Sequence, residues 1–75
     1  MRSMKQTDIA KKFGDHLRKL REATGRSQET MAATIGLDRS YYASIECGKR
    51  NVALRNIKKI AKGFKLSLSK LFEGV

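Results

Sequence analysis

Hydrophobic residues recur along this chain at the spacing of α-helices rather than that of β-strands. From Ile9 to Leu20 they fall every three or four residues, which gathers them in a stripe along one side of a helix. Alternation of apolar and polar residues is confined to short stretches, and proline is absent. Further helices are expected at 28–35, 39–46, 54–64 and 68–72. The pattern predicts a compact all-α fold of five short helices.

Residues that favour helix ends separate these segments. Thr7 or Asp8 is positioned to cap the first helix, and Gly25 is expected to end it. Three N-cap residues precede the second, third and fifth helices: Ser27, Asp38 and Ser67. The fourth helix has no clear cap, and its apolar face is expected to comprise Leu54, Ile57, Ile60, Ala61 and Phe64. We expect residues 1–75 to form one domain, with residues 1–6 as a loose basic arm.

The segment 28–46 meets the geometric requirements of a helix-turn-helix. Ala32 places a small side chain where two short helices cross, and Gly36 tolerates the positive φ that a tight turn requires. The apolar residues expected to hold both helices against the domain are Met31, Ile35, Leu37, Tyr42 and Ile45. A helical hairpin with a purely structural role would share several of these features and remains an alternative.

The charge of the chain favours a polyanionic partner. Seventeen Lys and Arg residues against seven Asp and Glu residues give a net charge of +10, with a pI near 10.3. Between Cys47 and Ser67 there are seven basic residues and no acidic one. Nucleic acid and an anionic membrane surface are both candidates, and a basic surface that only confers solubility is the alternative.

The expected third helix has an outward face suited to reading DNA. Tyr41 and Tyr42 are neighbours, so they point about 100° apart and face different surroundings; Tyr42 falls on the inward side. A recognition helix presents its N-terminal residues to base edges, and arginine can bond bidentately to guanine. The candidates for base contact are Arg39, Ser40, Tyr41 and Ser44. For Tyr41, partial burial against a neighbouring loop is the alternative.

Phosphate contacts, which fix the register of a protein on DNA, are expected at two places. Gln28 begins the second helix, where backbone N–H groups and the helix dipole favour an anion. Lys49, Arg50 and Asn51 follow the third helix in a polar connection. Glu46 ends that helix, an unfavourable position for an unpaired acid, so an ion pair with an arginine of the first helix is expected.

Other kinds of chemistry find little support. The chain has one histidine, His16, expected on the exposed side of the first helix, and no metal-ligand cluster, phosphate-binding glycine loop or nucleophile–base spacing. We therefore expect no enzyme activity, no catalytic residue, no metal and no cofactor. The single cysteine, Cys47, cannot form an internal disulfide, although a redox-sensor role is an alternative. No signal-like or membrane-length apolar run occurs, so a cytoplasmic, nucleoid-associated protein without a membrane partner is expected.

The sequence also resembles a known family. The segment S-Q-E-T-M-A-A-T-I-G-L-D-R-S-Y-Y-A-S-I-E is similar to the helix-turn-helix of Cro and phage repressors. The segments L-D-R-S-Y, G-K-R-N-V and N-I-K-K-I-A-K, with F-G-x-x-L-R-K-L-R upstream, resemble the controller proteins of restriction–modification systems. This resemblance covers about residues 12–73. It implies a lambda-repressor-like fold and a transcriptional regulator that times expression of such a system.

The resemblance also implies partners and residue roles. A homodimer, with one or two dimers per site, would bind a palindromic operator in double-stranded DNA, and RNA polymerase is a candidate further partner. The ion pair of Glu46 would be with Arg21. Phosphates would be contacted by Gln28, Lys49, Arg50 and Asn51, and bases by Arg39, Ser40, Tyr41 and Ser44. The dimer would form through a helix at 66–73, with Leu66, Leu68, Leu71 and Phe72.

Three departures from the family pattern qualify this resemblance. Cys47 stands where arginine or asparagine is common, and Tyr42 replaces a usual aliphatic residue. Gly63 and Lys65 occupy the region where a helix-ending glycine is often found in the family. The conformation of the link to the dimer helix therefore does not follow from the resemblance. A phage-type repressor, an antitoxin-like regulator that binds a partner protein, and charge-driven binding without sequence preference remain alternatives.

Overall fold

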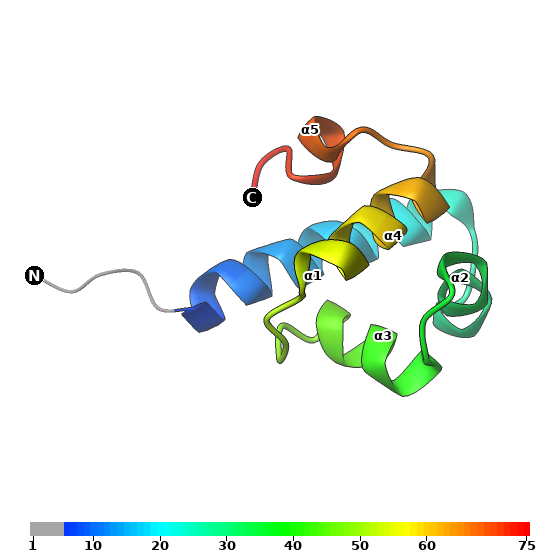
Figure 1. The fold of residues 1–75 in the computed structure, drawn as a ribbon, viewed down its shortest axis with the longest axis horizontal. Coiled ribbons are helices and arrows are strands. Elements are labelled where there is room, and N and C mark those ends of the chain that lie inside the picture. Colours follow the sequence, from blue (N-terminus) through cyan, green and yellow to red (C-terminus); the bar gives the residue numbers. More distant parts are fainter. Residues whose placement is uncertain (1–5) are drawn as a thin grey trace, which may run out of the picture.

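The computed structural model describes residues 6–75, which form five helices and, over that range, no strand (Figure 1). The helices are α1 (Gln6–Thr24), α2 (Gln28–Ile35), α3 (Arg39–Glu46), α4 (Leu54–Phe64) and α5 (Leu68–Leu71). The predicted all-α fold is thus confirmed. Most of the expected basic arm, residues 1–5, lies outside the described residues, whereas Gln6 already belongs to α1.

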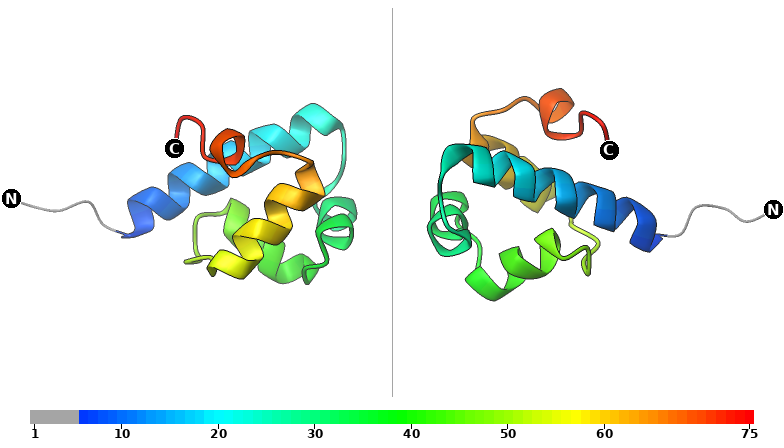
Figure 2. Two further views of the ribbon diagram at one scale, coloured as in Figure 1. Left: turned by 45° about the horizontal axis from the view of Figure 1, so that its top comes forward. Right: turned by 180° about the vertical axis from the view of Figure 1, so that it is seen from behind.

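The longest helix, α1, runs along the whole molecule, with α3 and α5 on opposite sides of it (Figures 1 and 2). Its start differs from the prediction. Thr7 and Asp8 lie inside α1 and are not its caps, because the helix already includes Gln6. Its end agrees, since α1 stops at Thr24 and Gly25 follows with a φ of 77°.

Local hydrogen bonds define α2, α3 and the turn between them. Ser27 Oγ accepts a hydrogen bond from the backbone N–H of Thr30 at 3.0 Å, and Asp38 Oδ2 accepts one from that of Tyr41 at 3.2 Å. Each such N-cap typically contributes about 1 kcal/mol. Gly36, with a φ of 90°, adopts the left-handed conformation that lets α2 end and the chain turn into α3. Both predicted caps and the predicted turn are confirmed.

The core is formed by side chains from all five helices. Its fully buried larger side chains are Leu17, Met31, Tyr42, Ile45, Ile60 and Leu71. Two residues assigned to inward stripes lie elsewhere: Leu54 is 84% exposed and Ile9 is 52% exposed. Both belong to the first turns of their helices, which extend beyond the packed part of α4 and α1. Periodicity identified the helical faces correctly but not where along each helix the core ends.

The contact between α2 and α4 depends on a glycine. A Cβ on Gly63 would lie 2.6 Å from Cγ1 of Ile35, so any larger residue would push the two helices apart. The helix-ending conformation falls instead on Lys65, which has a φ of 58° and follows the last residue of α4. A left-handed conformation costs a non-glycine residue about 1–2 kcal/mol. The link to α5 is therefore formed by a lysine where the family often places a glycine.

The short helix α5 is docked onto α1. Ser67 caps it as predicted, with its Oγ accepting from the N–H of Lys70 at 3.1 Å. The rings of Phe13 and Phe72 stack with their centroids 5.2 Å apart. His16 is half-buried, with Nε2 3.4 Å from the carbonyl oxygen of Lys70, so its expected exposed position is wrong. The cause is the return of α5 over this side of α1 (Figure 2).

Docking of α5 also corrects one expected dimer residue. Leu71 is fully buried in the core of the chain itself, so it holds α5 in place and has no surface left for a partner. Leu68 is 52% exposed, Phe72 is 38% exposed and Leu66 is partly exposed. The side chains of α5 are thus divided between the core of the chain and its surface.

Candidate nucleic-acid interface

The third helix lies at the edge of the molecule that faces away from α5 (Figures 1 and 2). Arg39 and Ser40 occupy its first turn and are exposed. The cap by Asp38 fixes the start of the helix beneath them, so both side chains project from an ordered end. This is the arrangement in which an N-terminal turn can enter the major groove of DNA, which is wide enough to admit a helix.

The C-terminal end of α3 is fastened by a buried ion pair. Arg21 Nε donates to Glu46 Oε2 at 2.6 Å, and Arg21 Nη2 donates to Glu46 Oε1 at 3.1 Å. Glu46 is only 3% exposed. A third hydrogen bond comes from Gln28 Nε2 to Glu46 Oε1 at 2.9 Å. One carboxylate therefore joins α1, the start of α2 and the end of α3, which sets the angle of the recognition helix.

These contacts shift the ionisation of the residues involved. Burial opposes the charge on Glu46, but the interactions with Arg21, Tyr42 and Gln28 outweigh burial and hold the pKa of Glu46 below its usual value. The hydrogen bond with Glu46 raises the pKa of Arg21. Burial, followed by the nearby Glu46 carboxylate, raises the pKa of Tyr42. The Tyr42 hydroxyl is buried and has no hydrogen-bond partner of ordinary geometry among the described residues.

Gln28 differs from the free phosphate ligand that the sequence suggested. It is half-buried, and the amide of its side chain is held by Glu46. Because one N–H of that amide is already used, a phosphate would be left with the second N–H and with the backbone N–H groups at the start of α2. The structure therefore gives Gln28 a structural contact in addition to any contact with DNA.

Two of the four expected base-facing residues are engaged within the chain. Asn56 Nδ2, in α4, donates to the hydroxyl of Tyr41 at 3.2 Å, and the guanidinium carbon of Arg50 lies 5.5 Å from the centroid of the Tyr41 ring. Ser44 Oγ donates to the carbonyl of Tyr41 at 2.6 Å and accepts from Arg50 Nε at 3.1 Å. The alternative for Tyr41, partial burial against a neighbouring loop, is what the structure shows.

Asn56 is the residue of this region that the sequence did not reveal. It lies in the first turn of α4, 15 positions after Tyr41, and although it begins the segment N-I-K-K-I-A-K, that segment suggested no contact for it. No local periodicity links the two positions, because they belong to different helices joined by the loop at 47–53. Only the fold brings them together.

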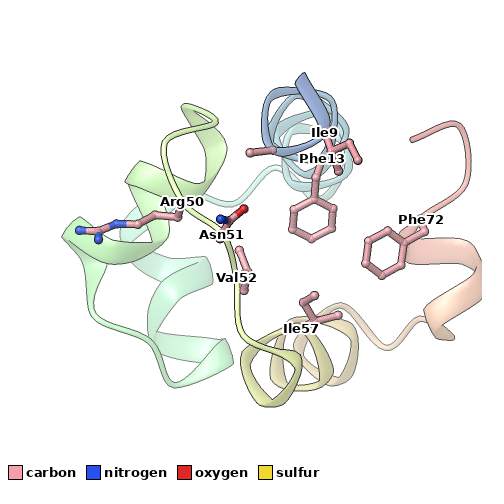
Figure 3. Close-up of a pocket in the computed structure, with 8 residues that line it drawn as sticks. Ile9, Phe13, Arg50, Asn51, Val52, Ile57 and Phe72 are labelled. Atoms are coloured by element: carbon pink, nitrogen blue, oxygen red, sulfur yellow. The ribbon is translucent and has the colours of Figure 1, made fainter. Parts of the chain in front are cut away.

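The loop after α3 exposes the expected phosphate ligands. Lys49, Arg50 and Asn51 are all exposed, and so is Cys47, the C-cap of α3. Figure 3 shows the other side of this loop, where an apolar pocket is lined by Ile9, Ala10, Phe13, Arg50, Asn51, Val52, Ile57 and Phe72. The side chain of Arg50 points away from that pocket (Figure 3), and its hydrogen bond to Ser44 places it against α3. Arg50 thus lies against α3, the helix that begins with the exposed Arg39 and Ser40.

Two properties of the described part of the chain bear on other chemistry. It contains no cluster of three or more His, Cys, Asp or Glu residues that could hold a metal ion. None of its helices is both long enough and apolar enough to cross a membrane.

Comparison with known proteins adds independent information. The family model described as helix-turn-helix matches residues 17–71. Control protein C.MunI of a Mycoplasma species is 55% identical over 69 residues, which cover 91% of this chain and 93% of that protein. The crystal structure of the restriction–modification controller protein C.AhdI from Aeromonas hydrophila has a TM-score of 0.86 and 46% identity, with 92% and 100% of the two chains covered.

A second solved controller protein shows the same fold at lower identity. The wild-type restriction–modification controller protein C.Esp1396I has a TM-score of 0.79 and 32% identity, with 87% of this chain and 83% of that chain covered. The matches span nearly the whole of this chain and include both α2 and α3. The chain therefore belongs to the helix-turn-helix family of DNA-binding regulators and, within it, to the restriction–modification controller proteins.

Proposed function

We propose that this chain acts as a homodimer that binds a palindromic operator and times transcription of a restriction–modification system. The observation that carries the proposal is the face formed by the first turn of α3 and the loop at 47–53. There Arg39 and Ser40 are exposed at the start of α3, Arg50 of the loop is bonded to Ser44 of the same helix, and the buried Arg21–Glu46 pair fastens the end of that helix.

Base reading is assigned to the start of α3. Arg39 can donate two hydrogen bonds to guanine O6 and N7, a contact worth about 1–3 kcal/mol of discrimination against other bases. Ser40 can donate or accept a hydrogen bond. Tyr41 and Ser44 lie further along the same helix, but their polar groups already have partners within the chain. We therefore place the main sequence selectivity on Arg39 and Ser40.

Phosphate binding is assigned to the loop after α3 and to the start of α2. Lys49, Arg50 and Asn51 are exposed and next to the recognition helix, and no acidic residue follows Glu46 until Glu73. The N–H groups at the start of α2, with the second amide hydrogen of Gln28, offer a further contact. These groups would fix the protein on the DNA backbone and supply the salt-dependent part of the affinity.

Dimerisation is assigned to the side of the molecule that carries α5. Leu68 and Leu66 line a shallow groove together with Ala61, Lys58 and Lys62. The exposed Leu68 and Phe72, with Leu66, are the candidates for contact with a second copy, because Leu71 is buried within the chain. A dimer would place two recognition helices about 34 Å apart, one turn of DNA, so that two short helices together specify a site.

The decisive experiment is selection of bound sequences from a random duplex library, combined with the mass of the bound complex. A two-fold symmetric site that holds two or four chains supports the proposal. Enrichment of no sequence would contradict it and favour charge-driven binding. Adding RNA polymerase to the complex of protein and selected duplex tests whether polymerase is a further partner. Such a complex would form on nucleoid DNA in the cytoplasm.

An antitoxin-like role in complex with a partner protein is the second candidate function. The α4–α5 groove could accept a protein chain other than a second copy, since its exposed leucines are flanked by Lys58 and Lys62. Stable monomers that bind the operator only together with a protein encoded nearby would favour this alternative.

A further inference from the structure

A small cluster of side chains joins the recognition helix to α4 and to the loop between them. The hydroxyl of Tyr41 accepts from Asn56 Nδ2, and the ring of Tyr41 lies beneath the guanidinium of Arg50. Ser44, one turn further along α3, accepts from Arg50 Nε. Three segments of the chain thus meet on the face assigned to DNA.

The cluster determines where Arg50 can point. A free arginine on a loop samples many rotamers and loses that freedom when it binds a ligand. Here Nε is bonded to Ser44 and the flat face of the guanidinium lies over an aromatic ring, a favourable cation–π arrangement. The hydrogen bond to Ser44 uses only Nε, so the N–H groups of the two terminal nitrogens can donate to DNA. Arg50 is thus held against α3 and does not move freely with its loop.

The position of the Tyr41 ring depends in turn on Asn56. The ring is half-buried beside the core, and its hydroxyl is its one polar anchor. Asn56 can serve as a fixed donor because it belongs to the first turn of α4, where its backbone N–H bonds to the carbonyl of Ala53 at 2.9 Å. A hydrogen bond from a helix restrains the ring better than one from a mobile loop would.

We propose that Asn56 is a positioning residue for DNA recognition. It holds Tyr41 by the hydroxyl, and Tyr41 holds Arg50 in the direction from which it contacts DNA; Asn56 itself touches no part of the DNA. This inference rests on the proposed function, because it concerns the same DNA-binding face. In this proposal Tyr41 orients Arg50 and does not contact a base.

The test measures dissociation constants for a labelled duplex that carries the sequence enriched by selection and for a shuffled duplex of the same composition. Asn56→Ala and Tyr41→Phe each remove one side of the same hydrogen bond. Each is expected to weaken binding to the selected duplex by about two- to tenfold. The double variant should be no weaker than either single variant, and the slope of affinity against salt should not change.

The background of Arg50→Ala gives the sharpest comparison. With Arg50 absent there is nothing left to orient, so adding Asn56→Ala should cause no further loss of affinity. Thr34→Ala is the control, since it also removes one hydrogen-bonding side chain, whose hydroxyl donates to the carbonyl of Thr30 at 3.0 Å outside this cluster. That control should bind the selected duplex as the unmodified protein does. Thermal unfolding of every variant shows whether the fold is retained.

Three outcomes would overturn the proposal. An Asn56→Ala variant that binds as the unmodified protein does would show that the hydrogen bond is irrelevant to DNA binding. A loss that persists undiminished in the Arg50→Ala background would show that Asn56 acts on DNA directly or through the fold. If the unmodified protein does not distinguish the selected duplex from the shuffled one, both this inference and the proposed function fail, whereas the first two outcomes leave the function intact.

Discussion

Arg21 of α1 and Glu46 at the end of α3 are joined by two hydrogen bonds of 2.6 and 3.1 Å, and the carboxylate is almost fully buried. The two residues are 25 positions apart, so their pairing fixes the recognition helix to the long helix behind it. Glu46 also receives the amide of Gln28. The orientation of α3 therefore depends on a charged contact as well as on apolar packing.

Removal of Arg21 should be strongly destabilising. Arg21→Met would leave Glu46 as an unpaired buried charge, which typically costs about 3–5 kcal/mol. Arg18→Met is the matched control, because Arg18 is in the same helix and pairs with Asp15 at 3.6 Å on the exposed surface. Such exposed pairs contribute about 0–1 kcal/mol. Urea unfolding followed by circular dichroism measures both; equal losses would show that burial of the Arg21–Glu46 pair has no special importance.

Stability should fall at acid pH partly through Glu46. The pKa of Glu46 is lower in the folded chain than the ordinary value of 4.5, so its contribution is fully present above about pH 4.5 and is lost as the pH falls through the folded-state pKa. The free energy of unfolding, measured between pH 7 and pH 2, should decrease less steeply for Glu46→Gln than for the unmodified protein. Identical slopes would contradict the assigned pKa shift.

Arg39 and Lys49 should affect DNA binding in different ways. Arg39→Ala is expected to weaken binding to the selected duplex by about 1–3 kcal/mol and to relax selectivity at one base pair in each half-site. Lys49→Ala should weaken binding to all duplexes and lower the slope of affinity against salt by about one. Fluorescence anisotropy titrations at several salt concentrations separate the two effects. If both variants lose affinity equally on selected and shuffled DNA, the division of roles is wrong.

Gly63→Ala should destabilise the contact between α2 and α4. The new Cβ would lie 2.6 Å from Cγ1 of Ile35, and overpacking of this kind typically costs about 1–3 kcal/mol. The double variant Gly63→Ala with Ile35→Ala removes the clashing atom, so the two changes should be less destabilising together than their sum. Thermal unfolding of the three variants measures this coupling. Strict additivity would show that α2 and α4 can adjust without strain.

Leu68 and Leu71 lie in the same short helix but should act on different properties. Leu71→Ala empties a fully buried position and should destabilise the protomer by about 2–5 kcal/mol. Leu68→Lys changes a side chain that is half exposed and should weaken dimerisation while the helical content is retained. Sedimentation velocity and circular dichroism distinguish the two. A Leu68→Lys variant that remains dimeric at every concentration would place the dimer surface elsewhere.

The helices and their ends could be predicted because the interactions that form them are local. The caps Ser27, Asp38 and Ser67 each accept a hydrogen bond from a backbone N–H three residues later. The start of α1 was placed wrongly because Thr7 and Asp8 have the composition of caps, and composition alone does not say where a helix begins. Faces were predicted from periodicity, but Leu54 shows that a face need not be buried along its whole length.

The candidate DNA-binding site was predictable only in part. Arg39 and Ser40 are exposed at the start of α3, where the position of the helix in the motif placed them. Tyr41 belongs to the same outward face, yet its hydroxyl is bonded to Asn56. Periodicity gives the direction of a side chain from its own helix; it does not show what a later segment places in front of that side chain.

The sequence by itself determined the helical period, the caps, the turn at Gly36 and the strongly basic character of the chain, since each depends on composition or on residues at most four positions apart. Only the tertiary structure decided that Leu71 is buried, that Glu46 holds Gln28 in addition to the expected Arg21, and that Tyr41 contacts both Asn56 and Arg50. Those relationships join residues far apart along the chain. They depend on how the helices pack in three dimensions, which no local pattern specifies.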